Sequence, residues 1–524
     1  MFDSDLVQPF FLILIPVFYL VGAITTAVFP SQSHTSGGTW AFGFAFASAI
    51  VSSIGGWWWP GTATWLNLAP LAQVMVLLVT LLGLILARFA KQYLEGEPGQ
   101  SRFMIWLHLT LTSVALITTT NHLLIFLGSW IAISTSLHQL LMFYPERPRA
   151  ALAAHKKFIF ARLAELCLIA AFTLLYASYD TLFISQILTM AAEATNLPPE
   201  AKIAALLMAV AALLKCAQLP FHGWLIQVVE APTPVSALLH AGVVNLGGFL
   251  MILMAPLISQ VSSAQWLLLV IAGPTAVFAS LVMMTRISIK VRLAWSTCAQ
   301  MGWMLVECAL GLYELALLHL VAHSAYKAHA FLNAGNTVES TLKKRLVAIS
   351  NPGWREVLPA AFLALILSVA SILVSNSSGP AQVVSWVVPG IALTILLSEM
   401  FAVKGGVAFM IRAVVLGAAF WTVYWVQKTA SYLLLTPPDN HASLLAISFT
   451  GLLLTMLIIG YFLVRYRRHS PLGIRFHRFL FAAAYLDEWA TRLTLKIWPV
   501  KLPNVVQPRS VVPIAPPARS KESV

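Results

Sequence analysis

Long apolar stretches separated by short polar connections run along almost the whole chain. A membrane-spanning helix needs about 20 predominantly apolar residues, and about fifteen stretches reach that length. They predict an all-α polytopic membrane protein with about 13–15 transmembrane helices. The candidate spans lie near residues 9–30, 39–58, 68–90, 103–120, 122–143, 157–179, 200–218, 234–257, 264–285, 293–312, 315–337, 356–375, 383–402, 406–426 and 442–465.

The composition supports a membrane protein. Only 10% of the residues are charged and 59% are hydrophobic, whereas an ordinary soluble domain has roughly 25% charged residues. Because a soluble fold could not cover so much apolar surface, the composition excludes a soluble enzyme, a nucleic-acid-binding domain and a secreted disulfide scaffold. The four cysteines lie inside apolar segments without zinc or iron–sulfur spacing, so we expect no metal and no cofactor; they are Cys167, Cys216, Cys298 and Cys308.

The basic residues predict the orientation of the chain in the membrane. The net charge is +13, and the excess gathers in connections that follow odd-numbered spans and in the C-terminal tail. Since basic connections mark the cytoplasmic side, we expect the N-terminus outside and the C-terminus inside, in contact with anionic lipids rather than nucleic acid. Asp3 and Asp5 stand where a signal peptide needs basic residues, so we expect the first apolar stretch to remain as a membrane-spanning helix. The clusters are Arg147, Arg149, Lys156 and Lys157; Arg286, Lys290 and Arg292; Lys343, Lys344 and Arg345; Lys404; and the basic residues from Arg465 onward.

Ionisable residues inside the predicted spans are candidates for function, because burying them in a membrane is costly. Glu165 lies in the sixth span, and Lys215 lies in the seventh, five residues before Pro220. A proline there should break the helix and open a polar pocket, with Glu165 as counter-charge to Lys215. The alternative is a structural ion pair, or a lysine that reaches the membrane interface. His240 in the eighth span, taken alone, is as readily structural as functional.

The eleventh span has the highest density of ionisable residues. His319, His323 and Lys327 recur every four residues, so they share one face of a helix and extend over about 12 Å of depth. This spacing is typical of a short proton path; the alternative is a polar seam between helices. A zinc site at His319 and His323 is disfavoured, because no glutamate follows the first histidine and no further ligand lies nearby.

Two longer motifs resemble a known family. They are Leu219-Pro220-Phe221-His222-Gly223-Trp224-Leu225 followed by Glu230-Ala231-Pro232-Thr233-Pro234-Val235-Ser236-Ala237-Leu238-Leu239-His240-Ala241, and His323-Ser324-Ala325-Tyr326-Lys327-Ala328. Both resemble the antiporter-like subunits of respiratory complex I, Mrp cation/proton antiporters and membrane-bound hydrogenases. A third segment, residues 295–302, resembles the same family's Ser-Thr-x-x-Gln-x-Gly stretch.

The resemblance implies two inverted five-helix repeats, each with a broken helix, and a chain of charged residues that moves protons. It assigns this pathway to Lys215, His240, His319, His323 and Lys327, with His222 and Glu230 in the motif and Glu165 as the acid. It implies these divisions: 1–100, N-terminal helices; 101–258 and 259–426, the two repeats; and 427–468, a C-terminal helix. In residues 469–502, aromatic residues are interspersed with Arg and Lys, an amphipathic pattern that predicts an interfacial helix or a docking surface for a partner. The Pro-rich residues 503–524 predict a disordered tail.

The chain departs from the family pattern at two positions. Trp130 is followed by Ile131 where the family has a glutamate, and the segment 375–379 lacks the usual second-half lysine. Glu399 or Lys404 are the candidate replacements for that lysine.

Within the family, the chain most resembles the DabB branch. This resemblance implies a proton- or cation-conducting subunit, not itself an enzyme, that energises inorganic carbon uptake with a DabA-like, zinc-containing large subunit. The alternatives are a proton-pumping subunit of complex I or a hydrogenase, an Mrp-type Na⁺/H⁺ antiporter subunit, and a membrane anchor without transport.

Overall fold

The computed structural model describes residues 6–29, 35–58, 61, 63–337, 352–374, 380–402, 406–435 and 442–500. Asp3, Asp5, Lys404, the cluster 343–345, the segment 375–379 and the Pro-rich tail 503–524 lie outside these residues. The helices are α1 (Val7–Val28), α2 (Thr35–Trp58), α3 (Pro70–Tyr93), α4 (Gln100–Thr119), α5 (Leu123–Leu141), α6 (Pro148–Tyr179), α7 (Ile184–Glu193), α8 (Pro199–Lys215), α9 (Gly223–Gln227), η3 (Val228–Glu230), α10 (Thr233–Ala241), η4 (Val243–Asn245), α11 (Leu246–Leu253), α12 (Ala255–Ile258), α13 (Ser262–Met283), α14 (Ile289–Ala309), α15 (Tyr313–Leu332), η5 (Asn333–Asn336), α17 (Trp354–Val374), α18 (Pro380–Phe401), α19 (Gly406–Leu434), α20 (Leu444–Tyr466), α21 (Pro471–Phe481), η6 (Ala483–Tyr485) and α22 (Glu488–Ile497).

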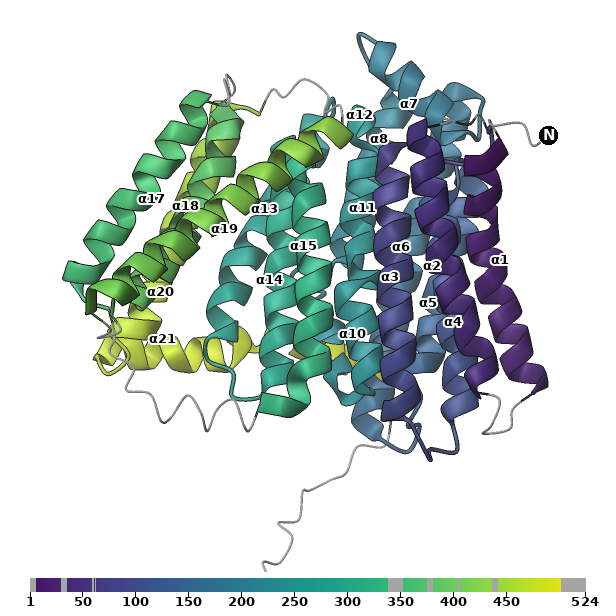
Figure 1. Ribbon diagram of the computed structural model, residues 1–524, viewed down its shortest axis with the longest axis horizontal. Coiled ribbons are helices and arrows are strands. Elements are labelled where there is room, and N and C mark those ends of the chain that lie inside the picture. The colour runs from purple at the N-terminus through teal and green to yellow at the C-terminus, as the bar shows by residue number, and fades with distance from the viewer. Residues whose placement is uncertain are drawn as a thin grey trace, which may run out of the picture.

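The predicted fold class is confirmed: the chain is an all-α polytopic membrane protein. Among the described residues, 12 helices are long and apolar enough to cross a membrane. Three further helices, α8, α14 and α15, lie at predicted spans; α8 has only 17 residues, and α14 and α15 carry charged side chains. The N-terminal end and the in-plane C-terminal helices lie at opposite ends of the bundle (Figure 1).

Two helices extend further than the hydropathy pattern predicts. Helix α6 begins at Pro148 rather than near residue 157, and α19 continues to Leu434 rather than ending near residue 426. Lys156 and Lys157 are therefore buried within α6, so the prediction that they lie in a connection between spans is wrong. Lys428 is likewise inside a helix. Apolar windows stop at lysines, although a buried partner allows a helix to continue through them.

The seventh span is broken where Pro220 predicts it. Helix α8 ends at Lys215, and the chain turns through residues 216–222 before the short helix α9 begins. A second interruption follows His240, because Gly242 leaves helical geometry and a 3-10 turn precedes α11. In the second half, α17 and α18 are each continuous, and the segment between them lies outside the described residues. Among the described residues of the second half, α17 and α18 therefore show no break comparable to the one at Pro220.

The helices form two packing units of unequal size. One core extends through α1–α15 and reaches α20. A smaller, separate core joins α17, α18 and α19 and contains Trp386 and Trp421. Helix α19 runs obliquely across the front of the molecule toward α15 (Figure 1). The interface between the units is made by α15 and α20 of the larger unit and by α18 and α19 of the smaller one.

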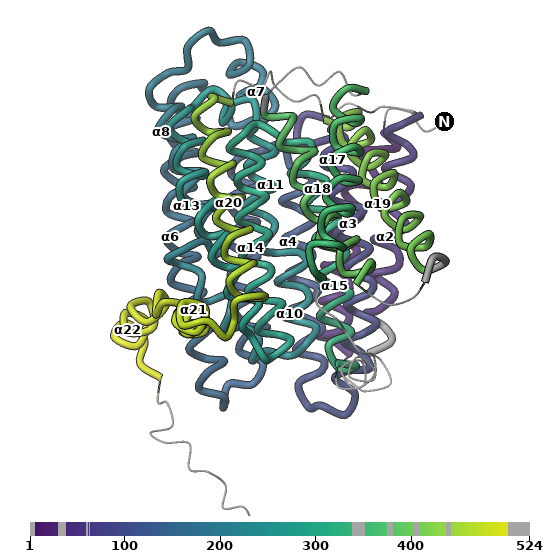
Figure 2. Tube along the Cα trace, turned by 90° about the vertical axis from the view of Figure 1, so that its left-hand side faces the viewer, coloured from purple at the N-terminus to yellow at the C-terminus, as the bar shows by residue number. Residues whose placement is uncertain are grey.

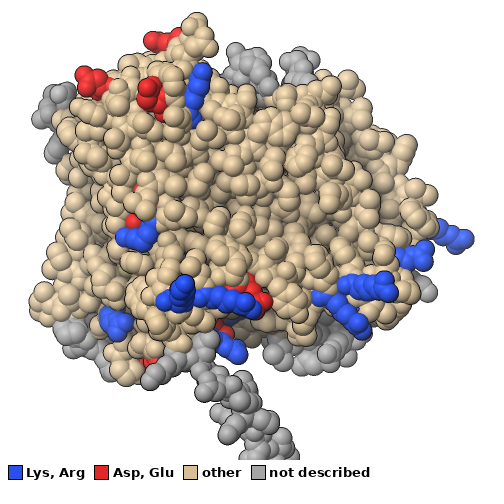
Figure 3. Space-filling model, turned by 180° about the vertical axis from the view of Figure 1, so that it is seen from behind, with Lys and Arg blue, Asp and Glu red and all other residues tan. Residues whose placement is uncertain are grey.

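The segment that the amphipathic pattern assigned to the interface lies across the lower end of the bundle. Helices α21 and α22 run roughly perpendicular to the spans (Figure 2). Their apolar residues Leu480 and Ala490 are buried, while Arg475 and Arg492 are exposed. Lys and Arg side chains gather along this lower edge, and the band above it is mostly uncharged (Figure 3). This arrangement suits a helix pair lying at a membrane surface.

Close packing of α13 against α14 requires a glycine at position 302. A Cβ atom there would lie 2.8 Å from the Ala272 carbonyl oxygen and 3.0 Å from the Ala276 amide nitrogen. Gly302→Ala should therefore lower the unfolding free energy by about 1–3 kcal/mol, measured as a lower melting temperature in detergent. Gly451→Ala on α20 is the matched control, since nothing lies within 4 Å of its Cβ position. Equal melting temperatures for the two variants would contradict the packing argument.

Candidate functional site

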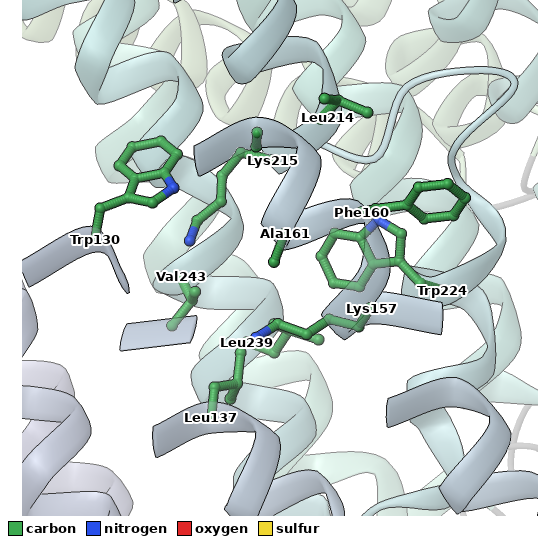
Figure 4. Close-up of a pocket in the computed structure, with 11 residues that line it drawn as sticks. Trp130, Leu137, Lys157, Phe160, Ala161, Leu214, Lys215, Trp224, Leu239 and Val243 are labelled. Atoms are coloured by element: carbon green, nitrogen blue, oxygen red, sulfur yellow. The ribbon is translucent and has the colours of Figure 1, made fainter. Parts of the chain in front are cut away.

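Two lysines face a small cavity between α5, α6 and α8. Lys157 of α6 and Lys215 at the end of α8 line a cavity of about 20 Å³, together with Trp130 and Trp224 (Figure 4). Such a volume holds one water molecule. Lys215 Nζ lies 4.5 Å from the centre of the Trp130 ring, so the face of an aromatic ring replaces the glutamate expected beside this lysine.

Glu165 contributes to the same site through α6 rather than by a direct pair with Lys215. Its carboxylate accepts a hydrogen bond from Arg162 at 2.7 Å. Arg162 also donates to Ser134 Oγ at 3.1 Å, and Lys157 Nζ donates to the Ser134 carbonyl oxygen at 2.6 Å. Among the described side chains, Lys215 forms no ion pair. Glu165 is therefore the one nearby carboxylate described for three cations, Arg162, Lys157 and Lys215. Lys215 itself faces the cavity.

The helix interruption on α10 places His240 beside α15. His240 is fully buried, and its ring stacks on Phe331 with 4.5 Å between centroids. In the described part of the chain, both of its ring nitrogens lack a hydrogen-bond partner. His323 Nε2 approaches the His240 carbonyl oxygen at 3.3 Å. A buried imidazole of this kind can take up or release a proton through water.

Helix α15 carries the expected stripe of ionisable residues. His319 and His323 lie one turn apart, with ring centroids separated by 6.2 Å. His319 Nδ1 contacts Glu307 Oε1 at 3.0 Å, and its Nε2 contacts Gln300 Oε1 at 2.8 Å. Oxygen acceptors at both ring nitrogens suit a protonated imidazole. Lys327, one turn beyond His323, is fully buried and donates to the Leu293 carbonyl oxygen at 3.2 Å.

A further polar cluster joins α15 to α18 and α19. Gln382 donates to Glu314 Oε1 at 3.0 Å, and Lys428 Nζ donates to Gln382 Oε1 at 3.2 Å. Lys428 also donates a short hydrogen bond to Ser385 Oγ. Both charged groups are buried, with Glu314 1% and Lys428 8% exposed. The stripe on α15 therefore has an acid, Glu314, toward the start of the same helix and a lysine, Lys428, on the adjacent helix α19.

Of the remaining candidates, one lies near the first cavity and two lie apart. His222 precedes α9, is buried, and its ring is 5.0 Å from the Trp295 ring. Glu230 ends η3 and is half-buried. Glu399 pairs with Arg465 at 2.8 Å and is 46% exposed, so its contact joins α18 to α20. Its proposed place in the pathway stays a prediction.

Sequence reasoning missed Lys157, Glu307, Glu314 and Lys428. Lys157 and Lys428 fell at predicted span ends, where a lysine is ordinarily a topology signal. The overlooked signal at Glu314 was its position only five residues before His319 on the same helix. Within the described ranges, no group of three or more His, Cys, Asp or Glu side chains could hold a metal ion.

The arrangement places buried ionisable side chains in a series of clusters from α6 to α19. The order along it is the α6–α8 cavity, His240, the α15 stripe, and the cluster around Glu314 and Lys428. Hydrogen bonds join the groups within each cluster. Between the clusters, a water molecule can bridge at the cavity of Lys157 and Lys215 or at the unpartnered ring nitrogens of His240.

Comparisons with known proteins identify the family and the fold. Residues 119–375 match the family described as "NADH:quinone oxidoreductase/Mrp antiporter, TM". The chain is 47% identical to a probable inorganic carbon transporter subunit DabB of Hydrogenovibrio crunogenus, over 85% of this chain and 86% of that protein. It is 35% identical to a probable inorganic carbon transporter subunit DabB2 of Halothiobacillus neapolitanus, over 85% and 82%. It shares its fold with a chain of the Mrp complex from Dietzia sp. (TM-score 0.61, 19% identity, covering 94% of this chain and 60% of that one).

The contributions of Arg162, Lys157 and Glu165 to the stability of the chain should depend on one another, because all three lie around Ser134. Glu165→Gln removes the carboxylate of a mostly buried pair and leaves Arg162 and Lys157 without compensation, so we expect a lower melting temperature of the full chain. The double variant Arg162→Gln/Glu165→Gln should recover part of the loss, because both charges are gone. Glu488→Gln, in an exposed pair with Arg492, should change stability by less than about 0.5 kcal/mol. A double variant less stable than Glu165→Gln would contradict the network.

Proposed function

Because this chain belongs to the family of antiporter-like, ion-translocating membrane subunits and, within it, to the DabB subunits, we propose that it conducts protons, or another monovalent cation, to energise inorganic carbon uptake. The observation that carries the proposal is the line of buried ionisable groups from Lys157 and Lys215 through His240 and His323 to Lys428. Buried ionisable residues are costly in a membrane, and structural packing alone does not call for so many in one line.

Each group in this line has a role that its surroundings suggest. Lys215 exchanges a proton with the cavity water. The negative charge of Glu165 partly compensates the positive charges of the surrounding cations. His240 relays between the two halves of the pathway, since both of its ring nitrogens are available. His323, Lys327 and His319 continue the path along α15. Lys428 and Glu314 form its far end, in place of the lysine that segment 375–379 lacks.

The ion gradient would supply the free energy for accumulation. One charge crossing 100 mV releases about 2.3 kcal/mol, so one or two ions support an appreciable gradient of bicarbonate. In this proposal, the chemistry on carbon dioxide belongs to a DabA-like, zinc-containing subunit with carbonic-anhydrase-like activity. The relatives named above are subunits of transporters, which supports a hetero-oligomer. The protein would lie in the bacterial inner membrane with its basic C-terminal face in the cytoplasm.

The rival functions differ in their partners and ions. A complex I or hydrogenase subunit needs redox partners with iron–sulfur centres, and an Mrp-type subunit supports sodium-dependent growth at alkaline pH. The identity over most of the chain's length favours the carbon-uptake branch over both.

Lys215→Ala should abolish growth that depends on inorganic carbon uptake, because the cavity loses its titratable group. A positioned acid or base speeds proton transfer by about 10²–10⁴-fold, so uptake of labelled bicarbonate should fall at least about tenfold. Lys202→Ala is the matched control: it lies on the same helix but is exposed, and it should transport normally. Co-purification with the partner subunit should be unchanged in both. Normal uptake by Lys215→Ala would refute the assigned role.

Lys428→Met should reduce uptake while preserving the packing of α19 against α18, since methionine fills a similar volume without a charge. We expect a loss of at least about tenfold, again because one proton-transfer group is missing. Arg412→Met on the same helix is exposed and serves as the control. If Lys428→Met transports at the rate of Arg412→Met, the pathway does not extend to α19.

A further inference from the structure

The C-terminal in-plane segment places a carboxylate against the break in the seventh span. Asp487, the residue before α22, lies against Gly223, the first residue of α9. A Cβ atom at position 223 would overlap the Asp487 carboxylate, so a glycine is needed for this close approach. Asp487 lies 260 residues beyond Gln227 in the chain, yet its carboxylate reaches α9, the short helix that follows the break after Lys215.

The carboxylate is held by groups from two other helices. Its Oδ2 accepts hydrogen bonds from Lys156 Nζ of α6 at 2.7 Å and from Gln227 Nε2 of α9 at 3.0 Å. Lys156 also donates to Thr491 Oγ1 at 2.8 Å. The Lys156 side chain is fully buried, whereas that of Asp487 is 24% exposed. The ion pair therefore joins the aqueous surface to the interior of α6.

Two polar atoms beside this ion pair are left unsatisfied. Among the described residues, Asp487 Oδ1 and His222 Nδ1 are both buried and have no hydrogen-bond partner. A buried carboxylate oxygen and a buried imidazole nitrogen without partners are ordinarily joined to water. His222 and Trp224 lie on either side of Gly223, and Trp224 lines the cavity of Lys157 and Lys215. The residues around Gly223 therefore lie between the Asp487 carboxylate and the cavity of Lys157 and Lys215.

We propose that Asp487 is the group through which protons pass between the aqueous face and the first-half cavity. A proton from the cavity passes through water to the ring of His222 and then to the Asp487 carboxylate, which weakens the ion pair with Lys156. Asp487 then gives the proton to water at the aqueous face, forming hydronium, and the restored carboxylate re-forms the ion pair. This inference rests on the proposed proton conduction, and it adds a surface acid from outside the two expected repeats.

The rival explanation is that Asp487 only anchors α22. Aromatic contacts also anchor that helix: the Trp489 ring lies 5.7 Å from that of Phe221 and 6.2 Å from that of Phe160. Trp489→Ala therefore loosens the helix while keeping the acid. Asp487→Asn keeps an oxygen that accepts from Lys156 but cannot carry a proton. The two variants separate anchoring from proton transfer.

The test measures proton flux into liposomes that contain the full-length chain, with an internal pH dye and a potassium diffusion potential. Asp487→Asn should lower the flux at least about tenfold, Asp487→Glu should retain most of it, and Glu488→Gln should match the unsubstituted protein. Limited proteolysis of α22 reports anchoring in the same samples. Trp489→Ala should become more sensitive to protease while losing less flux than Asp487→Asn.

Two results would overturn the inference. One is an Asp487→Asn flux equal to that of the unsubstituted protein. The other is a loss of flux that follows protease sensitivity equally in Asp487→Asn and Trp489→Ala, which assigns Asp487 to anchoring. An unsubstituted chain without any proton flux would instead contradict the proposed function on which this inference rests.

Discussion

The cost of burying positive charge inside an apolar bundle constrains the rest of this structure. An isolated ammonium group in a low-dielectric interior is strongly unfavourable unless it is paired, hydrated or deprotonated. Lys215 and Lys157 share one cavity, with Glu165 the nearby acid, which pairs with Arg162. The site therefore relies on the Trp130 ring, the Ser134 oxygens and room for water. The positive charge at this site is therefore only partly compensated.

Helix interruptions supply the space and the polar atoms that these charges need. Helix α8 ends at Lys215, and the 3-10 turn after His240 separates α10 from α11. At both places the backbone gives up helical hydrogen bonds, and at both places an ionisable side chain lies beside the interruption. Non-helical backbone at membrane depth is tolerated where it is covered by protein or lines a hydrated cavity. The breaks and the buried charges are thus two aspects of one arrangement.

The two ends of the polar line are completed by elements outside the matched family segment. Lys428 reaches it from α19, and Asp487 approaches from the segment before α22, whereas the family match covers residues 119–375. Both contacts form between helices that are distant in the sequence: the smaller core of α17–α19 meets α15, and the in-plane helices pack on α6 within the larger core. Such joints between parts are places where movement of one element can alter the charge environment of another.

The sequence by itself determined the membrane class, the order of the spans, the break at Pro220 and the stripe from His319 to Lys327. These depend on local hydropathy, on the geometry of proline and on the helical repeat, all of which act within a few residues. Only the tertiary structure decided that Lys156, Lys157 and Lys428 are buried, that Lys215 lies against the Trp130 ring, and that Asp487 reaches Gly223. Hydropathy treats a lysine at the end of an apolar run as a boundary, and its burial depends on partners far away in the chain: 331 residues separate Lys156 from Asp487. Such pairing is set by how the helices pack, which local pattern does not encode.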